Sequence, residues 1–299
     1  FAEAADSRIA CPVVIDASDQ AEPADWPVRR AAAAVDPTPP ERDDLFCIQY
    51  TSGTTSTPKG VMLTERMYLQ TALWCVRCQM LTPESSFMSA APFFHCSGSM
   101  HAITVCLLAG CALHQMSAWD VEFFLRLVRQ HRGSVSHGTF LRDIVAFGTD
   151  RARPFLETMK VVAATGTQRD LQLIHDELGA TGISNLYGMT ETCGNFSMWF
   201  PDDPLEKRCA ANGRPQPGNE IRIADPETGV TCAPGRTGEI QMKGHTLTPG
   251  YFRRPDANAS AFTADGWFRS GDLGAMSDQG ELHYIARLKE IVRVGGENV

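Results

Sequence analysis

The chain has 299 residues and a formal net charge of −8 at pH 7, and 43% of its residues are hydrophobic. At about 150 residues per domain this length predicts roughly two domains, and the ordinary composition excludes a disordered or fibrous chain. The acidic balance argues against a nucleic-acid-binding protein, although a local site can still bind an anion. The most apolar stretch, 102–113, is shorter than the ~20 residues of a membrane span. With no signal peptide visible, we expect a cytoplasmic protein without membrane insertion.

The ten cysteines are scattered along the chain, which argues against a disulfide framework. Cys75 and Cys78 form the one Cys-x-x-Cys pair, inside a stretch with a helical pattern, Leu69–Met80. No second pair stands at zinc-binding spacing. A redox or metal role is one interpretation, but the sequence favours two buried thiols on one helix.

Short β-type runs alternate with helical windows between Leu45 and about Phe200, which predicts an α/β layer with a mostly parallel sheet. The expected strands cover 46–50, 87–91, 111–115 and 160–164, and the expected helices cover 64–80, 100–108, 121–131 and 170–178. Before this region, Asp36–Asp44 is rich in proline and charge and is typical of a linker. After Pro201 the apolar segments 220–224, 238–243 and 281–285 are short and alternating, which favours a smaller β-rich subdomain.

The segment Tyr50–Gly60 reads Tyr-Thr-Ser-Gly-Thr-Thr-Ser-Thr-Pro-Lys-Gly and follows an apolar strand. Backbone N–H groups of a glycine-containing turn can form an anion nest, and the hydroxyls and Lys59 add donors and a positive charge. The segment is not a Walker A loop, because Pro58 precedes the lysine and no Ser or Thr follows it. A solvated loop is the alternative, but the density of donors favours a polyphosphate site.

A second segment, Asn185–Thr192, reads Asn-Leu-Tyr-Gly-Met-Thr-Glu-Thr. Gly188 allows a tight turn after a strand, Glu191 offers a hard oxygen to Mg²⁺, and Thr190 places a hydroxyl beside it. Tyr187 offers a flat face to a purine. Taken alone, the segment fits an ordinary turn equally well.

Two further segments lie towards the C-terminus. Gly266–Gly274 places Asp272 on an expected glycine-flanked turn, where its carboxylate could accept both hydrogen bonds of a ribose diol. An aspartate that only shapes a β-turn is the alternative. Ala286–Val299 alternates basic and apolar residues and then contains Gly-Gly, which predicts a strand that runs into a flexible turn.

In this order the four segments resemble the adenylate-forming superfamily: acyl- and aryl-CoA synthetases, luciferases and the adenylation domains of peptide synthetases. The resemblance covers about Leu45–Val299. Pro92–Gly98 resembles the acyl-pocket motif of the CoA-ligase branch, and Gly238–Tyr251 resembles the β-subdomain motif. Lys160–Thr167 resembles the strand and turn that border the adenine and acyl sites. The implied fold is the large α/β N-terminal domain of these enzymes, with mostly parallel sheets flanked by helices plus a smaller β-rich subdomain.

The resemblance also implies a division of the chain. Residues 1–45 would end a first N-terminal layer and form a linker, and 46–200 would form the α/β region that binds nucleotide and acyl group. Residues 201–285 would form the β-rich subdomain, and 286–299 the hinge to a C-terminal domain that is absent from this chain. Because that domain carries the family's catalytic lysine, we expect the 299-residue chain to bind its ligands but to adenylate poorly.

Residue roles follow from the same resemblance. The ATP phosphates would be bound by Thr51, Ser52, Gly53, Thr54, Thr55 and Lys59. The rest of the nucleotide site would comprise Gly166, Thr167, Tyr187, Gly188, Thr190, Asp272 and Arg287, with Tyr187 stacked on adenine. The acid would be bound by His95, Ser97, Gly98, His137, Thr165, Gly166 and Met189. Lys59, Thr190, Glu191 and His95 would act in catalysis, with Glu191 as the Mg²⁺ ligand. Lys289 matches the hinge, and Arg293 matches a basic position near the site. For His137, a structural place in the core is the alternative.

Two positions depart from the family pattern: Ser56 replaces a glycine of the phosphate loop, and Ala286 stands where many members have Gly or Asp. The implied activity is that of a carboxylic acid–CoA ligase using ATP, Mg²⁺ and CoA. The acid would be adenylated with release of pyrophosphate, and the CoA thiol would then take the acyl group. The expected pocket segments are rich in small, apolar and sulfur-containing residues, which suits an aryl or a short to medium aliphatic acid. These segments are His95–His101, Ser134–Leu141, Ala163–Thr167 and Met189–Ser197.

Three alternatives remain at this stage. The first is an amino-acid-activating domain, which usually carries an aspartate in the acyl-pocket motif to pair with the α-ammonium of its substrate. Phe93–Gly98 contains no acidic residue, so the sequence favours a substrate without an α-amine. An enzyme that loads a carrier-protein thiol is compatible with the same motifs. A nucleotide-binding relative without catalysis is disfavoured by the presence of Lys59, Glu191, Asp272 and Arg287.

Overall fold

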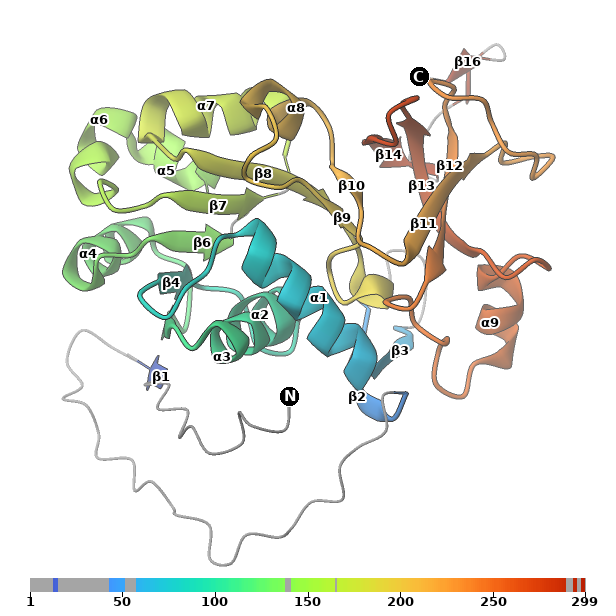
Figure 1. Cartoon of the computed structure of the whole chain (residues 1–299), viewed down its shortest axis with the longest axis horizontal. Helices are drawn as coiled ribbons and strands as arrows, with labels where there is room; N and C mark the ends of the chain where they lie inside the picture. Colours follow the sequence, from blue (N-terminus) through green and yellow to red (C-terminus); the bar gives the residue numbers. More distant parts are fainter. Residues whose placement is uncertain are drawn as a thin grey trace, which may run out of the picture.

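The structure, a computed structural model, describes residues 13–15, 43–51, 58–137, 141–164, 166–288, 293–294 and 297–298. Its largest sheet has eight strands in the order β1-β5-β4-β6-β7-β8-β9-β10 (Figure 1). The strands from β1 to β8 in this order run parallel to their neighbours, and β9 and β10 run antiparallel. The bounds are β1 Val13–Ile15, β4 Ser86–Ser89, β5 Ala112–Gln115, β6 Val135–His137, β7 Val161–Ala164, β8 Gly182–Tyr187, β9 Ser197–Met198 and β10 Arg214–Pro215. The predicted mostly parallel sheet is therefore confirmed.

Helices cover both faces of this sheet, and each face has its own hydrophobic core. Phe87 packs in a cluster with residues of α1 (Glu65–Cys78) and α3 (Val105–Ala109). The next residue, Met88, packs in a second cluster with α4 (Val121–His131), α5 (Leu141–Phe147) and α7 (Gln168–Leu178). Adjacent residues of a strand point to opposite faces, so burial on both sides explains why β7 is apolar throughout, with Val161 in the first cluster and Val162 in the second.

The remaining helical segments are short. They are α2 Cys96–Gly98, the π-helix η1 Ser99–Thr104, α6 Thr149–Ala152, the 3₁₀ turns η2 Arg153–Phe155 and η3 Thr190–Thr192, α8 Leu205–Ala210 and α9 Pro255–Ala261. The predicted helix at 100–108 is thus a π-helical stretch followed by α3. The Asp120 side chain accepts a hydrogen bond from the backbone N–H of Phe123 and caps the start of α4.

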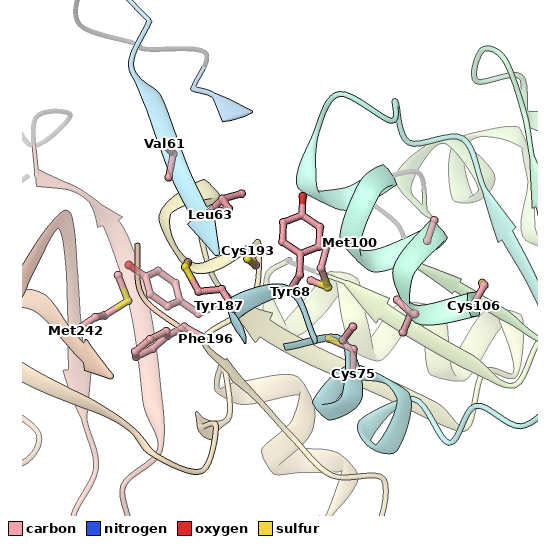
Figure 2. Close-up of a cluster of buried hydrophobic side chains, with 14 of the residues drawn as sticks. Val61, Leu63, Tyr68, Cys75, Met100, Cys106, Tyr187, Cys193, Phe196 and Met242 are labelled. Carbon is pink, nitrogen blue, oxygen red and sulfur yellow. The ribbon is translucent and has the colours of Figure 1, made fainter. Parts of the chain in front are cut away.

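A four-stranded antiparallel sheet forms the β-rich part, from β11 (Asn219–Ala224) through β12 (Gly238–Gly244) and β13 (Phe268–Met276) to β14 (Leu282–Arg287). The first hydrophobic cluster continues into it, because Met242 packs with Tyr187 of β8 and with Phe196, which directly precedes β9 (Figure 2). One core therefore joins the two sheets. The domain boundaries at 200 and 285 stay a prediction. Two short strands, β15 Arg293–Val294 and β16 Glu297–Asn298, pair with each other.

One expected strand has a different partner. The segment 46–50 lies in β2 (Leu45–Tyr50), which pairs antiparallel with β3 (Gly60–Thr64) in a separate hairpin rather than in the parallel sheet. The connection 51–59 is shorter than the dozen or so residues that a parallel crossover needs. The expected phosphate loop is therefore the loop of a hairpin, closed at its base by a hydrogen bond from the Thr51 N–H to the Lys59 carbonyl (3.0 Å).

Cys75 and Cys78 both lie in α1 and are buried, which confirms the interpretation as two buried thiols on one helix. Burial raises the pKa of Cys75 to about 12 and raises that of Cys78 as well, so neither thiol is a ready nucleophile. Within the residues that the structure describes, no helix is long and apolar enough to cross a membrane.

Candidate active site

The turn between β8 and β9 brings several predicted residues together. Gly188 opens it, and a Cβ at this position would lie 2.5 Å from the backbone N of Asn195 and the carbonyl carbon of Gly194. Only glycine therefore allows the two ends of the turn to approach this closely. The 3₁₀ turn Thr190–Thr192 lies between them and buries Glu191, which is 6% exposed. Met189 precedes it and packs against the first core.

Glu191 is held from the β-rich side of the molecule. The hydroxyl of Tyr251 donates a hydrogen bond of 2.7 Å to Glu191 Oε1, and the backbone N–H of Thr248 donates to the Glu191 carbonyl (2.8 Å). Lys59 Nζ lies 4.7 Å from the centroid of the same tyrosine ring, a cation–π contact. Burial, and then the nearby Glu191 carboxylate, raise the pKa of Tyr251. The hydroxyl therefore acts as a donor at neutral pH.

A second group lies where β8 ends beside β13 and β14. The Tyr187 hydroxyl donates a hydrogen bond of 2.7 Å to Asp272 Oδ2, and Arg287 Nη1 forms an ion pair with Asp272 Oδ1 at 3.0 Å. Asp272 and Arg287 are direct cross-strand neighbours. Asp272 therefore lies within strand β13 and not on the expected turn, because its pairing with Arg287 of β14 continues the strand past Gly271.

The electrostatics of this group follow from its burial. Asp272 is 2% exposed, and burial raises its pKa, while the Tyr187 hydrogen bond and the Arg287 charge oppose that shift. The ring of Tyr284 faces that of Tyr187, with centroids 6.0 Å apart and planes at 28°. Tyr284 is 41% exposed, so solvent reaches this end of the group.

The expected acyl-pocket motif surrounds the start of α2. His95 is exposed and caps the helix: its Nδ1 accepts a hydrogen bond from the Ser97 N–H (3.1 Å) and lies 2.7 Å from the Ser97 hydroxyl. Desolvation by neighbouring atoms lowers the pKa of His95. Gly98 ends this short helix and is buried.

Two further imidazoles, those of His101 in η1 and His137 at the end of β6, lie near this motif. The rings of His101 and His137 stack with centroids 4.2 Å apart, and His101 Nδ1 lies 3.7 Å from the Cys75 sulfur. Burial is the largest cause that lowers the pKa of both histidines, to about 4 for His137.

The other predicted residues are placed as follows. Gly166 accepts a hydrogen bond on its carbonyl from Asn185 Nδ2 (3.3 Å). Thr167 caps α7 through reciprocal hydrogen bonds with Asp170, so its hydroxyl already has a partner. Ser52, Gly53, Thr54, Thr55, Thr165 and Lys289 lie outside the described residues, and of Arg293 only the strand position is described.

Sequence reasoning gave no role to Tyr251 or Tyr284. Tyr251 closes the Gly238–Tyr251 motif, so the signal for it was present, but its partner Glu191 stands far away in the sequence. Among the described residues, no group of three or more His, Cys, Asp or Glu side chains is arranged to hold a metal ion. Glu191 with the adjacent Thr190 fits Mg²⁺ only together with phosphate oxygens, which is the usual manner of Mg²⁺ binding.

Comparison with known proteins gives consistent matches. Residues 2–252 match the family described as AMP-binding enzyme. The 2-succinylbenzoate–CoA ligase of Bacillus licheniformis is 32% identical over 260 residues, which are 86% of this chain and 52% of that protein. ATP-bound MatB from Rhodopseudomonas palustris superposes with a TM-score of 0.79 at 30% identity, covering 87% of this chain and 51% of that one. MenE from Bacillus subtilis, in complex with ATP and magnesium ion, gives a TM-score of 0.75 at 27% identity, with 87% and 53% covered.

The chain thus spans about half the length of these relatives. The agreement of the folds confirms the predicted class, an α/β domain of the adenylate-forming type with a β-rich part. By its sequence match and by its fold, the chain belongs to the AMP-binding enzyme family.

Proposed function

We propose that the protein is an ATP-dependent carboxylic acid–CoA ligase, which forms an acyl-adenylate and passes the acyl group to the CoA thiol. The observation that carries the proposal is the arrangement around the turn after β8. Lys59 and Glu191 meet at Tyr251, and Tyr187 and Asp272 meet at the strand end that precedes the same turn. Lys59 and Glu191 would thus serve the phosphates, Glu191 through Mg²⁺. Tyr187 and Asp272, beside them, would serve the nucleoside.

The first group suits the phosphates. The Lys59 ammonium would offset the negative charge that develops on departing pyrophosphate, and such charge stabilisation is most of what a protein can contribute to this type of transfer. Thr190 and Glu191 would provide oxygen ligands for Mg²⁺. When bound, Mg²⁺ neutralises phosphate charge. The relative solved with ATP and magnesium ion supports ATP and Mg²⁺ as the groups that bind here.

The second group suits the nucleoside. Asp272 would accept hydrogen bonds from the ribose hydroxyls, with Arg287 fixing the carboxylate through the ion pair. An adenine ring between Tyr187 and Tyr284 would need about 7 Å between the ring centres, twice the ~3.5 Å contact distance of carbon atoms. The observed distance is 6.0 Å. The exposed Tyr284 would therefore move outward when adenine stacks on Tyr187.

The reaction follows in two balanced steps. A carboxylate oxygen of the acid attacks the α-phosphorus of ATP, the bond from this phosphorus to the bridging oxygen breaks, and pyrophosphate leaves. The sulfur of CoA then attacks the acyl carbonyl, loses its proton, and AMP leaves with the bonding electron pair. CoA as the acceptor is supported by relatives such as the 2-succinylbenzoate–CoA ligase. His95 and Ser97 would border the reacting acid.

Carboxylate-dependent ATP–pyrophosphate exchange on the complete gene product tests the first step. A panel of aryl, aliphatic and amino acids is used, with Glu191→Gln as the test variant and the exposed Glu220→Gln as its matched control. Exchange with one class of acid, lost only in Glu191→Gln, supports adenylation. Exchange absent for every acid, with ATP binding retained, would refute it and favour a non-catalytic nucleotide-binding relative.

The acceptor is tested separately. Exchange-active acids are incubated with ATP and CoA, and acyl-CoA is quantified by chromatography. Stoichiometric acyl-CoA supports the ligase. Accumulation of acyl-adenylate without acyl-CoA would instead favour an enzyme that loads a carrier-protein thiol.

A further inference from the structure

Three histidines from three elements meet behind the Glu191 turn. His95 caps α2, His101 lies in η1, and His137 is the last residue of β6. The imidazoles of His101 and His137 stack, and a Cβ on Gly194, in the turn that carries Glu191, would lie 2.9 Å from His101 Nε2. The cluster therefore lies at the carboxyl end of a parallel strand, which is where open α/β sheets bind ligands.

Two ring nitrogens of this cluster, His101 Nε2 and His137 Nε2, are buried and make no hydrogen bond within the described part of the chain. His101 Nε2 lies against Gly194, whereas His137 stands at the end of strand β6. Buried polar atoms are nearly always hydrogen-bonded, so an exception at the edge of a candidate site calls for a ligand or a water as partner. The strand position supports this interpretation, because His137 pairs with Ala163 of β7, which lies in the segment Lys160–Thr167 that the resemblance places beside the acyl site.

The surroundings of His137 indicate what kind of partner would fit. Burial and the nearby His95 lower the pKa of His137, and burial and His137 lower that of His101. The imidazoles are therefore uncharged at neutral pH. A neutral imidazole nitrogen pairs well with a hydroxyl, which can both donate and accept, whereas a desolvated carboxylate would lack a counter-charge there.

We propose that His137 is a specificity-determining residue that hydrogen-bonds a hydroxyl group on the acid substrate. The proposal rests on the ligase function proposed above. It names the substrate class as hydroxy-substituted aryl or medium-chain acids, in preference to plain hydrocarbon acids and to dicarboxylic acids.

The test compares matched acids in the exchange assay with the complete gene product. The pairs are 4-hydroxycinnamate against cinnamate and 6-hydroxyhexanoate against hexanoate, with adipate as the dicarboxylate. A plain acid would leave His137 Nε2 unpaired, which lowers kcat/KM. In the pair that the enzyme uses better, we therefore expect the kcat/KM of the hydroxy acid to exceed that of the plain acid roughly ten- to a hundredfold.

Three variants separate binding from folding. His137→Leu should abolish the preference for the hydroxy acid, mainly by raising its KM, because uniform binding is lost. His137→Gln, which keeps a polar group, should retain part of it. His175→Leu is the matched control, because this histidine lies in the last turn of α7, outside the proposed site. Its Nδ1 is hydrogen-bonded to the Ala180 carbonyl. Thermal unfolding and ATP binding of each variant show whether it folds.

The outcomes are distinct. Equal exchange with hydroxy and plain acids, or a preference for adipate, would overturn the substrate class and leave the ligase function standing. A hydroxy preference that survives in a folded His137→Leu protein would overturn the role of His137. Absence of exchange with every acid would refute the ligase function and this inference with it. If His137→Leu does not fold, the wild-type ratio and the His137→Gln variant decide.

Discussion

The Tyr251 hydroxyl donates a hydrogen bond of 2.7 Å to the buried carboxylate of Glu191, and the face of the same tyrosine ring contacts Lys59. One side chain that follows the β-rich strand β12 thus positions both charges of the proposed phosphate site. Tyr251 is itself fixed, because its backbone forms a bridge with Val61 of the β2–β3 hairpin.

Replacing Tyr251 by phenylalanine tests this positioning. Tyr251→Phe keeps the ring beside Lys59 but removes the hydrogen bond to Glu191, and we expect exchange to fall about tenfold, the effect of one charge-assisted hydrogen bond. The Mg²⁺ concentration for half-maximal exchange should rise. Thermal unfolding of Tyr251→Phe is the control that the variant folds. Unchanged exchange and Mg²⁺ dependence in Tyr251→Phe would show that this hydrogen bond does not position Glu191.

Asp272→Asn tests the nucleoside side of the site. The amide keeps the shape but loses the charge that pairs with Arg287, so we expect ATP affinity to fall roughly ten- to a hundredfold. Isothermal titration with ATP measures it directly. Asp265→Asn is the control, because its ion pair with Arg222 is more exposed and lies outside the site. Equal ATP affinity of the two variants would contradict the assignment of Asp272.

Gly188→Ala tests the turn that brings these groups together. The new Cβ would lie 2.5 Å from backbone atoms of Gly194 and Asn195, and such overpacking should lower the free energy of unfolding by about 1–3 kcal/mol. In Gly166→Ala the nearest atom would be 3.6 Å away, so stability should stay within about 0.5 kcal/mol. Urea unfolding of the two variants makes the comparison, and equal losses would mean that the close approach is not what requires glycine.

A histidine pair distant from the site predicts acid sensitivity. Burial, and then the charge of the stacked His131, lower the pKa of His114 from 6.5 to about 4. Between these values the unfolded chain binds a proton that the folded chain does not, so stability is lost as pH falls from 6.5 towards 4. Allowing for solvent screening, His114→Gln should reduce that loss by about 1–2 kcal/mol, measured by urea unfolding at pH 7 and pH 5. An identical loss in the variant would contradict the shift.

Local pattern predicted much of this architecture, because the relevant information lies close together in the sequence. The predicted helix 121–131 has the bounds of α4 (Val121–His131), and the predicted helix 170–178 lies within α7 (Gln168–Leu178). The motif around Tyr187 and Glu191 pointed to a site. What could not be predicted depends on partners far apart in the chain. The donation from Tyr251 to Glu191 exists only once the β-rich part packs against the turn after β8. The strand that holds Asp272 forms only when β13 pairs with β14.

The hydrophobic core shared by the two sheets also limits how the chain can be recombined with relatives. Met242 and Phe268 pack in the same cluster as Tyr187 and Phe196, so a chimera that exchanges residues 201–285 brings in one half of an interior whose other half it does not replace. A chimera with its crossover in the mostly exposed loop 226–237, between β11 and β12, keeps Met242 and Phe268 together, because β12 and β13 then come from the same parent. It separates these two strands from β11, which comes from the other parent. A functional exchange of this segment must therefore carry matched core residues from both sheets.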